Sequence, residues 1–265
     1  MKKTILILSI ALALGACSRT TQTTSGSAYL SQYSSVPVAE PVTIASKDGT
    51  VTEYKSIDQR VREAAAVEPV LRFPARIGLA RIDGRQLTMI PAEESEAWGN
   101  LAKRLGAGYG EFVPVNPMIA SMVANNGAPG QRPTDAIDLI RLGAARQHLD
   151  AVLIYEVLAK ESKRSNILSI ANASIIGGYV LPSKIHDAEG LGNALLIDVM
   201  QAYPYGTVTT EVEKTRLSSS WGWGSDYDDS QKASDAIKVQ AASQLADEAY
   251  DMLIELRDQL YQKKK

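Results

Sequence analysis

The residues that most enzymes use for catalysis are scarce in this chain. Its 265 residues include one cysteine, Cys17, and two histidines, His148 and His186. Nucleophilic hydrolysis requires a serine or cysteine beside a base, and neither a G-x-S-x-G nor an S-x-x-K pattern occurs in the sequence. We expect His148 at a helix end and His186 in a solvated loop. The sequence therefore predicts no catalytic residue and no enzyme activity.

Two patterns resemble ligand-binding loops but lack a necessary residue. Residues 106–110 (GAGYG) alternate glycines, yet Glu111 replaces the third glycine of a dinucleotide loop, and a strand rather than a helix is expected to follow. Residues 226–229 (DYDD) resemble the start of a calcium loop, but Gln231 and Ile237 stand where an EF-hand requires glycine and glutamate. We therefore predict no cofactor and no metal site.

The segment 218–229 (SSSWGWGSDYDD) has an unusual composition. Trp221 and Trp223 lie among serines and glycines directly after a charged segment, and Tyr227 follows. Exposed tryptophan is enriched at protein and membrane interfaces. We predict that Trp221, Trp223 and Tyr227 contact a partner, the membrane or a glycan. The alternative is that both indole rings fold back over the end of the preceding hairpin.

The first 17 residues (MKKTILILSIALALGAC) predict export and lipidation. Lys2 and Lys3 precede a short apolar stretch, and small residues lead into Cys17. The apolar stretch is shorter than the roughly 20 residues that span a bilayer, and this arrangement is typical of a secretory signal. The LGAC ending resembles the lipobox of bacterial lipoproteins, which implies that Cys17 is acylated. Ser18 after the cysteine then favours the outer membrane, with the domain facing the periplasm.

Residues 18–55 are rich in Ser, Thr, Gln, Gly and Pro and show no apolar period in most of their length. This composition predicts a flexible polar tether. The formal net charge is −2, and removal of Lys2 and Lys3 with the signal makes it more negative, which argues against nucleic-acid binding. We expect a single α/β domain over residues 56–265.

Hydrophobic periodicity predicts the elements of that domain. A capping box at Ser56 starts a short helix, and the final helix carries apolar residues at steps of three or four. The predicted strands are 70–82, 112–115, 151–158, 193–201 and 207–217, and the predicted helices are 56–67, 91–105, 134–148 and 230–261. The fold class is thus α/β, a single mixed sheet with packed helices in the order β-α-β-α-β-β-β-α and a long C-terminal helix. The core is expected to place these residues under the final helix: Ile77, Leu79, Leu153, Leu195, Ile197 and Val199.

Three features together resemble one group of envelope proteins. They are Cys17 with its polar tether, the helix that leads through residues 148–150 (HLD) into 151–157 (AVLIYEV), and the strand–turn–strand of 193–213 before the last helix. Over about residues 70–260 the chain resembles the curli-secretion-channel lipoprotein family, the amino-terminal domain of the Tol translocation protein, and lipoprotein activators of peptidoglycan synthases. The resemblance implies an anticodon-binding-domain-like fold. It also implies a role as scaffold, oligomer subunit or regulator.

The expected function is therefore that of a membrane-anchored lipoprotein acting as a non-enzymatic binding or assembly module in envelope biogenesis, secretion or surface-polymer export. Its expected partners are the bilayer, through acylated Cys17, and an envelope protein or further copies of the chain. The alternative is a periplasmic hydrolase whose paired carboxylates come together only in the folded chain.

Overall fold

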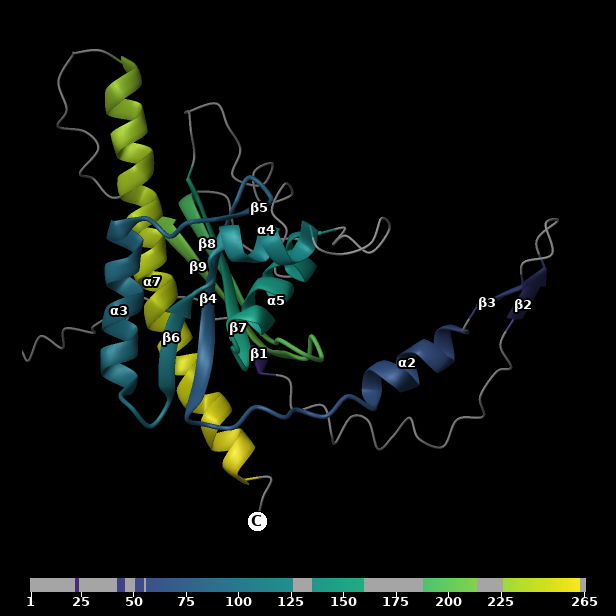
Figure 1. Cartoon of the computed structure of the whole chain (residues 1–265). Coiled ribbons are helices and arrows are strands. Elements are labelled where there is room, and N and C mark those ends of the chain that lie inside the picture. Colours follow the sequence, from purple (N-terminus) through teal and green to yellow (C-terminus); the bar gives the residue numbers. More distant parts are fainter. Residues whose placement is uncertain are drawn as a thin grey trace, which may run out of the picture.

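Seven strands form one mixed sheet through the centre of the protein (Figure 1). The computed structural model describes residues 22–23, 42–45, 51–54, 56–125, 135–159, 188–213 and 226–262. The strands are β1 (Gln22–Thr23), β4 (Ala75–Asp83), β5 (Gln86–Thr88), β6 (Gly110–Pro114), β7 (Ala151–Ala159), β8 (Ala188–Asp198) and β9 (Pro204–Glu213). Their order is β1-β9-β8-β7-β4-β5, with β6 beside the first half of β4. Strand β4 is parallel to β6 and β7, and the other pairs are antiparallel.

Helices cover both faces of this sheet. On one face lie α3 (Ala92–Leu105) and the long α7 (Asp226–Gln262), and on the other lie α4 (Pro117–Asn125) and α5 (Ala136–Arg146). A further helix, α2 (Ile57–Ala65), has no buried residue and stands apart from the sheet (Figure 1). The α/β prediction with a single mixed sheet and a long C-terminal helix is confirmed. No helix among the described residues is both long enough and apolar enough to cross a membrane.

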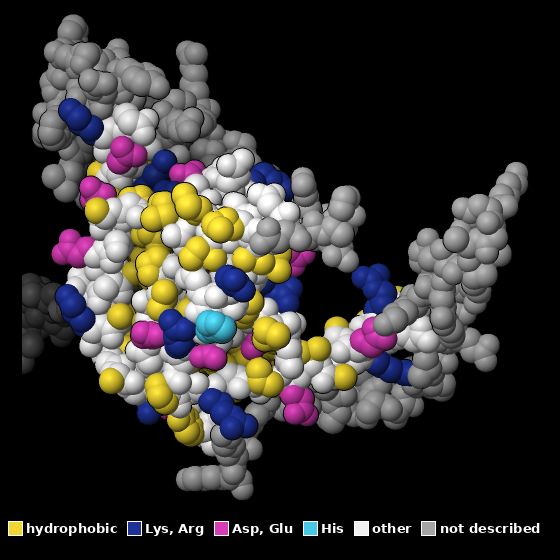
Figure 2. Space-filling view, viewed as in Figure 1, with side chains coloured by type: hydrophobic (Ala, Val, Ile, Leu, Met, Phe, Trp, Pro, Cys, Tyr) yellow, Lys and Arg dark blue, Asp and Glu magenta, His cyan; other side chains and the backbone are white. Residues whose placement is uncertain are grey.

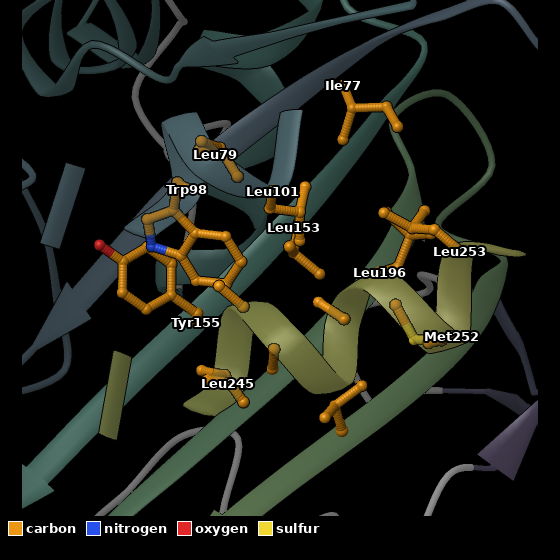
Figure 3. Packing of buried hydrophobic residues seen from close by; sticks show 14 of the residues in the cluster. Ile77, Leu79, Trp98, Leu101, Leu153, Tyr155, Leu196, Leu245, Met252 and Leu253 are labelled. Atoms are coloured by element: carbon orange, nitrogen blue, oxygen red, sulfur yellow. The ribbon is translucent and has the colours of Figure 1, made fainter. Parts of the chain in front are cut away.

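Helix α7 packs against the sheet through the predicted apolar stripe. Ala241, Leu245, Ala249 and Met252 are all fully buried, and Figure 3 shows Leu245 and Met252 directed toward the strands. On the same face, Trp98 and Leu101 of α3 complete the layer. A helix turns every 3.6 residues, so apolar residues three or four positions apart lie on one side of it. This spacing in the sequence correctly predicted the buried side of α7.

The predicted core is only half correct. Ile77, Leu79 and Leu153 pack on the α7 side, but Leu195, Ile197 and Val199 belong to the cluster on the α5 side. Their neighbours in β8, Ala194 and Leu196, face α7 instead. The alternation of a strand shows which of its residues share a face of the sheet. Because helices cover both faces of this sheet, the residues on both faces are apolar. The sequence pattern therefore does not show which helix covers which face.

Two elements within residues 56–265 were missing from the predicted order. Strand β5 follows a two-residue turn at Gly84 and Arg85, both with positive φ, and pairs back on β4. Asp83-Gly84 is a recognised signal for such a hairpin. Helix α4 carries no charged residue, so its sequence lacks the polar face that marks a surface helix.

Several boundaries also differ from the prediction. Helix α2 has the predicted capping box at Ser56, but α5 is capped by Asp135 rather than by Thr134, which lies outside the described residues. Strand β4 begins only at Ala75. The β8–β9 turn occupies residues 199–203, so β8 starts and ends several residues earlier than expected and β9 starts earlier. The predicted last residues of β9, 214–217, lie outside the described residues.

Three short strands lie within residues 18–55. Strand β1 pairs with β9, and β2 (Val42–Ala45) pairs with β3 (Val51–Tyr54) in a separate two-stranded sheet. The composition of the tether did not anticipate these strands. The division into signal, tether and domain stays a prediction.

Candidate interaction surface

The predicted site residues fall mainly outside the described part of the chain. This is true of Cys17, His186, Trp221 and Trp223. Tyr227 lies in the first turn of α7, where only the backbone is described. The lipidation at Cys17 and the partner contact at Trp221, Trp223 and Tyr227 stay predictions.

The glycines of residues 106–110 form a turn from helix to strand. Gly106 follows the last residue of α3 with φ of 73°, and Gly110 opens β6 with φ of 101°. A Cβ at Gly110 would lie 1.9 Å from the carbonyl oxygen of Ala75, so the close approach of β4 requires glycine there. The turn interpretation therefore explains this pattern without a bound phosphate.

A buried polar cluster ties α3 to β4 and β7. The Arg81 Nε donates to both carboxylate oxygens of Glu94, at 3.1 and 2.8 Å, and its Nη1 donates to Asp83 at 2.8 Å. The Tyr155 hydroxyl donates to Glu94 Oε2 at 2.9 Å. Arg81 is 5% exposed and Glu94 is 2% exposed. The ring of Tyr155 also packs on Trp98, with centroids 4.7 Å apart (Figure 3).

The electrostatics of this cluster favour a structural role. Burial lowers the pKa of the Arg81 guanidinium, but its hydrogen bonds to Glu94 and Asp83 outweigh that effect and raise the pKa above the ordinary value. Burial, reinforced by the charge of Glu94, raises the pKa of Tyr155. Arg81 thus stays charged and Tyr155 stays neutral. Because both oxygens of Glu94 accept hydrogen bonds inside the protein, this carboxylate is not available to a substrate.

A second buried cluster fixes the β8–β9 turn. The Asp198 Oδ1 accepts hydrogen bonds from the backbone N–H groups of Met200 and Gln201, at 2.8 and 2.7 Å. The Tyr205 hydroxyl donates to Asp198 Oδ2 at 3.1 Å and accepts from the backbone N–H of Leu71 at 3.0 Å. Burial raises the pKa of Tyr205. The Tyr205 hydroxyl therefore connects the segment before β4 to the β8–β9 turn.

Tyr205→Phe is expected to destabilise the protein by about 1–3 kcal/mol, because it leaves the buried Leu71 N–H without its acceptor. Urea denaturation monitored by circular dichroism measures the loss. Tyr250→Phe is the control: it removes a hydroxyl from a half-buried ring on α7 and keeps the ring on which Arg104 packs. An equal loss in both variants would contradict the assigned role of the Tyr205 hydroxyl.

The outer side of α4 is an exposed surface without charge. Met118 is 72% exposed and Met122 is 62% exposed, and Ser121 and Asn125 lie on the same side of the helix. We call these four residues the α4 face. Figure 2 shows hydrophobic side chains gathered over the part of the surface where α4 and β5 lie in Figure 1. Methionine adapts its shape to different partners, so exposed methionines are typical of binding surfaces.

Helix α4 is held rigidly behind this face. Its inner residue Ala120 packs so closely on α5 that a Cβ at Gly143 would lie 2.7 Å from the Ala120 Cβ. The Asn116 Oδ1 accepts hydrogen bonds from the N–H groups of Met118 and Ile119 at 2.8 and 3.3 Å, which caps the helix. The α4 face is thus presented by a fixed scaffold. An uncharged nine-residue stretch with methionines four residues apart was the signal for it in the sequence.

Helix α2 presents a second unpartnered apolar surface. Ile57, Val61, Ala64 and Ala65 follow the spacing of one helical stripe, which we call the α2 stripe. Ile57 is 67% exposed and Val61 is 46% exposed. The remaining positions carry Gln59 and four charged residues whose charges cancel: Asp58, Arg60, Arg62 and Glu63. The α2 stripe therefore has the pattern of a buried helix face, and none of the described elements covers it.

Metal-binding residues do not gather in the described part of the chain. Across those residues, no three histidine, cysteine, aspartate or glutamate side chains lie close enough together to hold an ion.

Comparisons with known proteins leave the family open. No family model matches the chain, and no curated protein matches it. Among solved structures, the chain is similar to a dodecameric PelC variant from Paraburkholderia phytofirmans. The two share 12% identity over 68% of this chain and 94% of that one, with a TM-score of 0.31. A similarity at that level identifies neither fold nor function, so the resemblance to envelope lipoproteins stays a prediction.

Proposed function

We propose that this chain is a membrane-anchored lipoprotein that acts as a non-enzymatic binding and assembly module in envelope biogenesis, secretion or surface-polymer export. The observation that carries the proposal is the contrast between its polar and apolar groups. The buried charged groups of Arg81 and Glu94 bind each other in the interior, whereas large apolar side chains of α2 and α4 face outward. A large side chain such as Met118 is stabilised when a partner covers it.

The proposed anchor is Cys17, acylated after removal of residues 1–16. Its support is the basic start, the short apolar stretch and the LGA residues before the cysteine. The proposed location of this protein is the outer membrane, facing the periplasm, and the support for this location is Ser18 directly after the cysteine. Its partners are an envelope protein or further copies of the chain.

The alternative hydrolase would require two accessible carboxylates at a suitable separation. Asp83 and Glu94 both bind Arg81, but Glu94 is buried and its oxygens are already hydrogen-bonded. This pair therefore favours a structural cluster over a catalytic dyad.

Cys17→Ser is expected to move the protein out of the membrane fraction or to leave it unprocessed, because the thiol that carries the lipid is gone. Cell fractionation and metabolic labelling with a fatty-acid analogue measure the two effects. Ser18→Ala is the matched control, since it changes the adjacent residue and keeps the thiol. Wild-type protein that incorporates no label would refute the proposed anchor.

A further inference from the structure

Two apolar surfaces of this chain lie exposed and do not meet each other. The α2 stripe belongs to a helix with no buried residue, and the α4 face belongs to a helix whose other side is packed on α5. Neither surface has a covering element among the described residues (Figure 1). We propose that the α2 stripe of one copy docks on the α4 face of a second copy.

The first support is the length of α2. It has nine residues, and isolated helices shorter than about 12–15 residues are marginal in water. The capping box of Ser56 and Gln59 pairs two backbone N–H groups at the start of the helix, which does not replace a packed face. A helix of this length is stable when its apolar stripe is covered, and no element in the described part of the chain covers the stripe of α2.

The second support is the fit between the two surfaces. An amphipathic helix binds a partner through anchors at i and i+4, and Ile57 and Val61 have this spacing. Met118 and Met122 are also four residues apart, on a helix without charge. Charged residues of α2 flank its stripe, whereas α4 itself carries no charge, so the docked pair would bury apolar groups and leave the charges of α2 at the rim.

The third support is the short connection between α2 and the sheet. Leu71 and Phe73 are buried on the α7 side, and the Leu71 N–H is held by Tyr205. Five residues, 66–70, remain between α2 and this fixed point, so the chain from Ala65 to Leu71 spans at most about 20–22 Å. The α4 face lies on the opposite side of the sheet from Leu71. In the structure α2 lies away from the α4 face of its own chain (Figure 1), which leaves it available to a neighbour.

Such a contact joins two different surfaces, so each copy offers both a donor helix and an acceptor face. Repeated head-to-tail contacts of this kind generate a ring or an open filament. One short helix makes a small interface, which is weak between free molecules. Anchoring through Cys17 confines the copies to one membrane and raises their effective concentration, which strengthens the contact. This strengthening rests on the proposed function.

The test is crosslinking between two differently tagged full-length chains in intact membranes. One chain carries Val61→Cys and the other carries Met122→Cys, and a short bismaleimide joins thiols that lie close together. A product that contains both tags is expected. The control pairs Val61→Cys with Met200→Cys, because Met200 is 77% exposed but lies in the β8–β9 turn rather than on the α4 face. We expect at least about tenfold less product from the control pair.

Failure of docking and failure of the anchor give different results. Wild-type chains without introduced cysteines yield no crosslinked product if Cys17 is acylated, since it is the only cysteine. A product from wild type would reveal a free Cys17 thiol and refute the anchor, and docking is then tested in a Cys17→Ser background. Equal products from the test and control pairs would overturn the docking proposal. So would a chain with both cysteines that crosslinks only within itself.

A second measurement does not depend on thiols. Val61→Glu and Met122→Glu both change exposed side chains, so folding is expected to remain intact, and each is expected to reduce assemblies of the detergent-extracted protein to single chains. Met200→Glu is expected to leave the assemblies unchanged. Docking of α2 on lipid instead would appear as loss of binding to phosphatidylglycerol vesicles by Val61→Glu with unchanged assembly size, and this result would overturn the proposal.

Discussion

Leu245→Asp is expected to abolish cooperative folding of the domain. Leu245 is fully buried in the middle of α7, against the strands of the sheet (Figure 3). The substitution removes about 2–3 kcal/mol of apolar burial and places an unpaired charge in the core, which costs several kcal/mol more. The sum of about 5–8 kcal/mol equals or exceeds the total stability of a domain in the lower part of the usual range of about 5–15 kcal/mol. Thermal unfolding followed by circular dichroism measures the effect.

Gln240→Asp is the matched control for this variant. It introduces the same side chain five residues earlier on the same helix, at an exposed position. We expect its free energy of unfolding to lie within about 0.5 kcal/mol of wild type. A Leu245→Asp protein with the melting temperature of wild type would show that α7 does not form the core.

Arg81→Met is expected to destabilise the protein by about 3–5 kcal/mol, because it leaves the buried carboxylate of Glu94 without its cation. The double variant Arg81→Met with Glu94→Gln is expected to recover most of this loss. Glutamine removes the buried charge and retains an acceptor for the Tyr155 hydroxyl. Urea denaturation of wild type, both single variants and the double variant gives the coupling energy. Additive losses in the double variant would contradict the assigned pairing of Arg81 with Glu94.

Local periodicity explains which parts of the fold were predictable. The stripe of α7 and the capping box of α2 depend on residues three or four apart, and both are confirmed. The layer assignment of Leu195 and Ile197 depends on which helix covers which face of the sheet, and that information is not local. For this reason, the alternation in β8 correctly predicted a strand, but the prediction that its residues pack under α7 was wrong.

The interior clusters could not be predicted because their members are distant in the sequence. Glu94 lies 13 residues from Arg81 and 61 from Tyr155, and the Leu71 N–H lies 134 residues from the Tyr205 hydroxyl. Nothing in the local pattern pairs these groups. The α4 face is different: residues 117–125 (PMIASMVAN) are visibly uncharged, but a mainly apolar stretch without charge predicts a buried helix, and here the methionines are exposed.

Native mass spectrometry of the protein extracted from membranes by detergent tests the central claim most directly, because it reports the mass of each chain and the number of chains in a particle. We predict chains that begin at Cys17 and carry the added mass of acyl groups, in particles that contain more than one chain. Unlipidated chains, or lipidated chains that are always single and without a partner protein, would contradict the claim that this protein is a membrane-anchored assembly module.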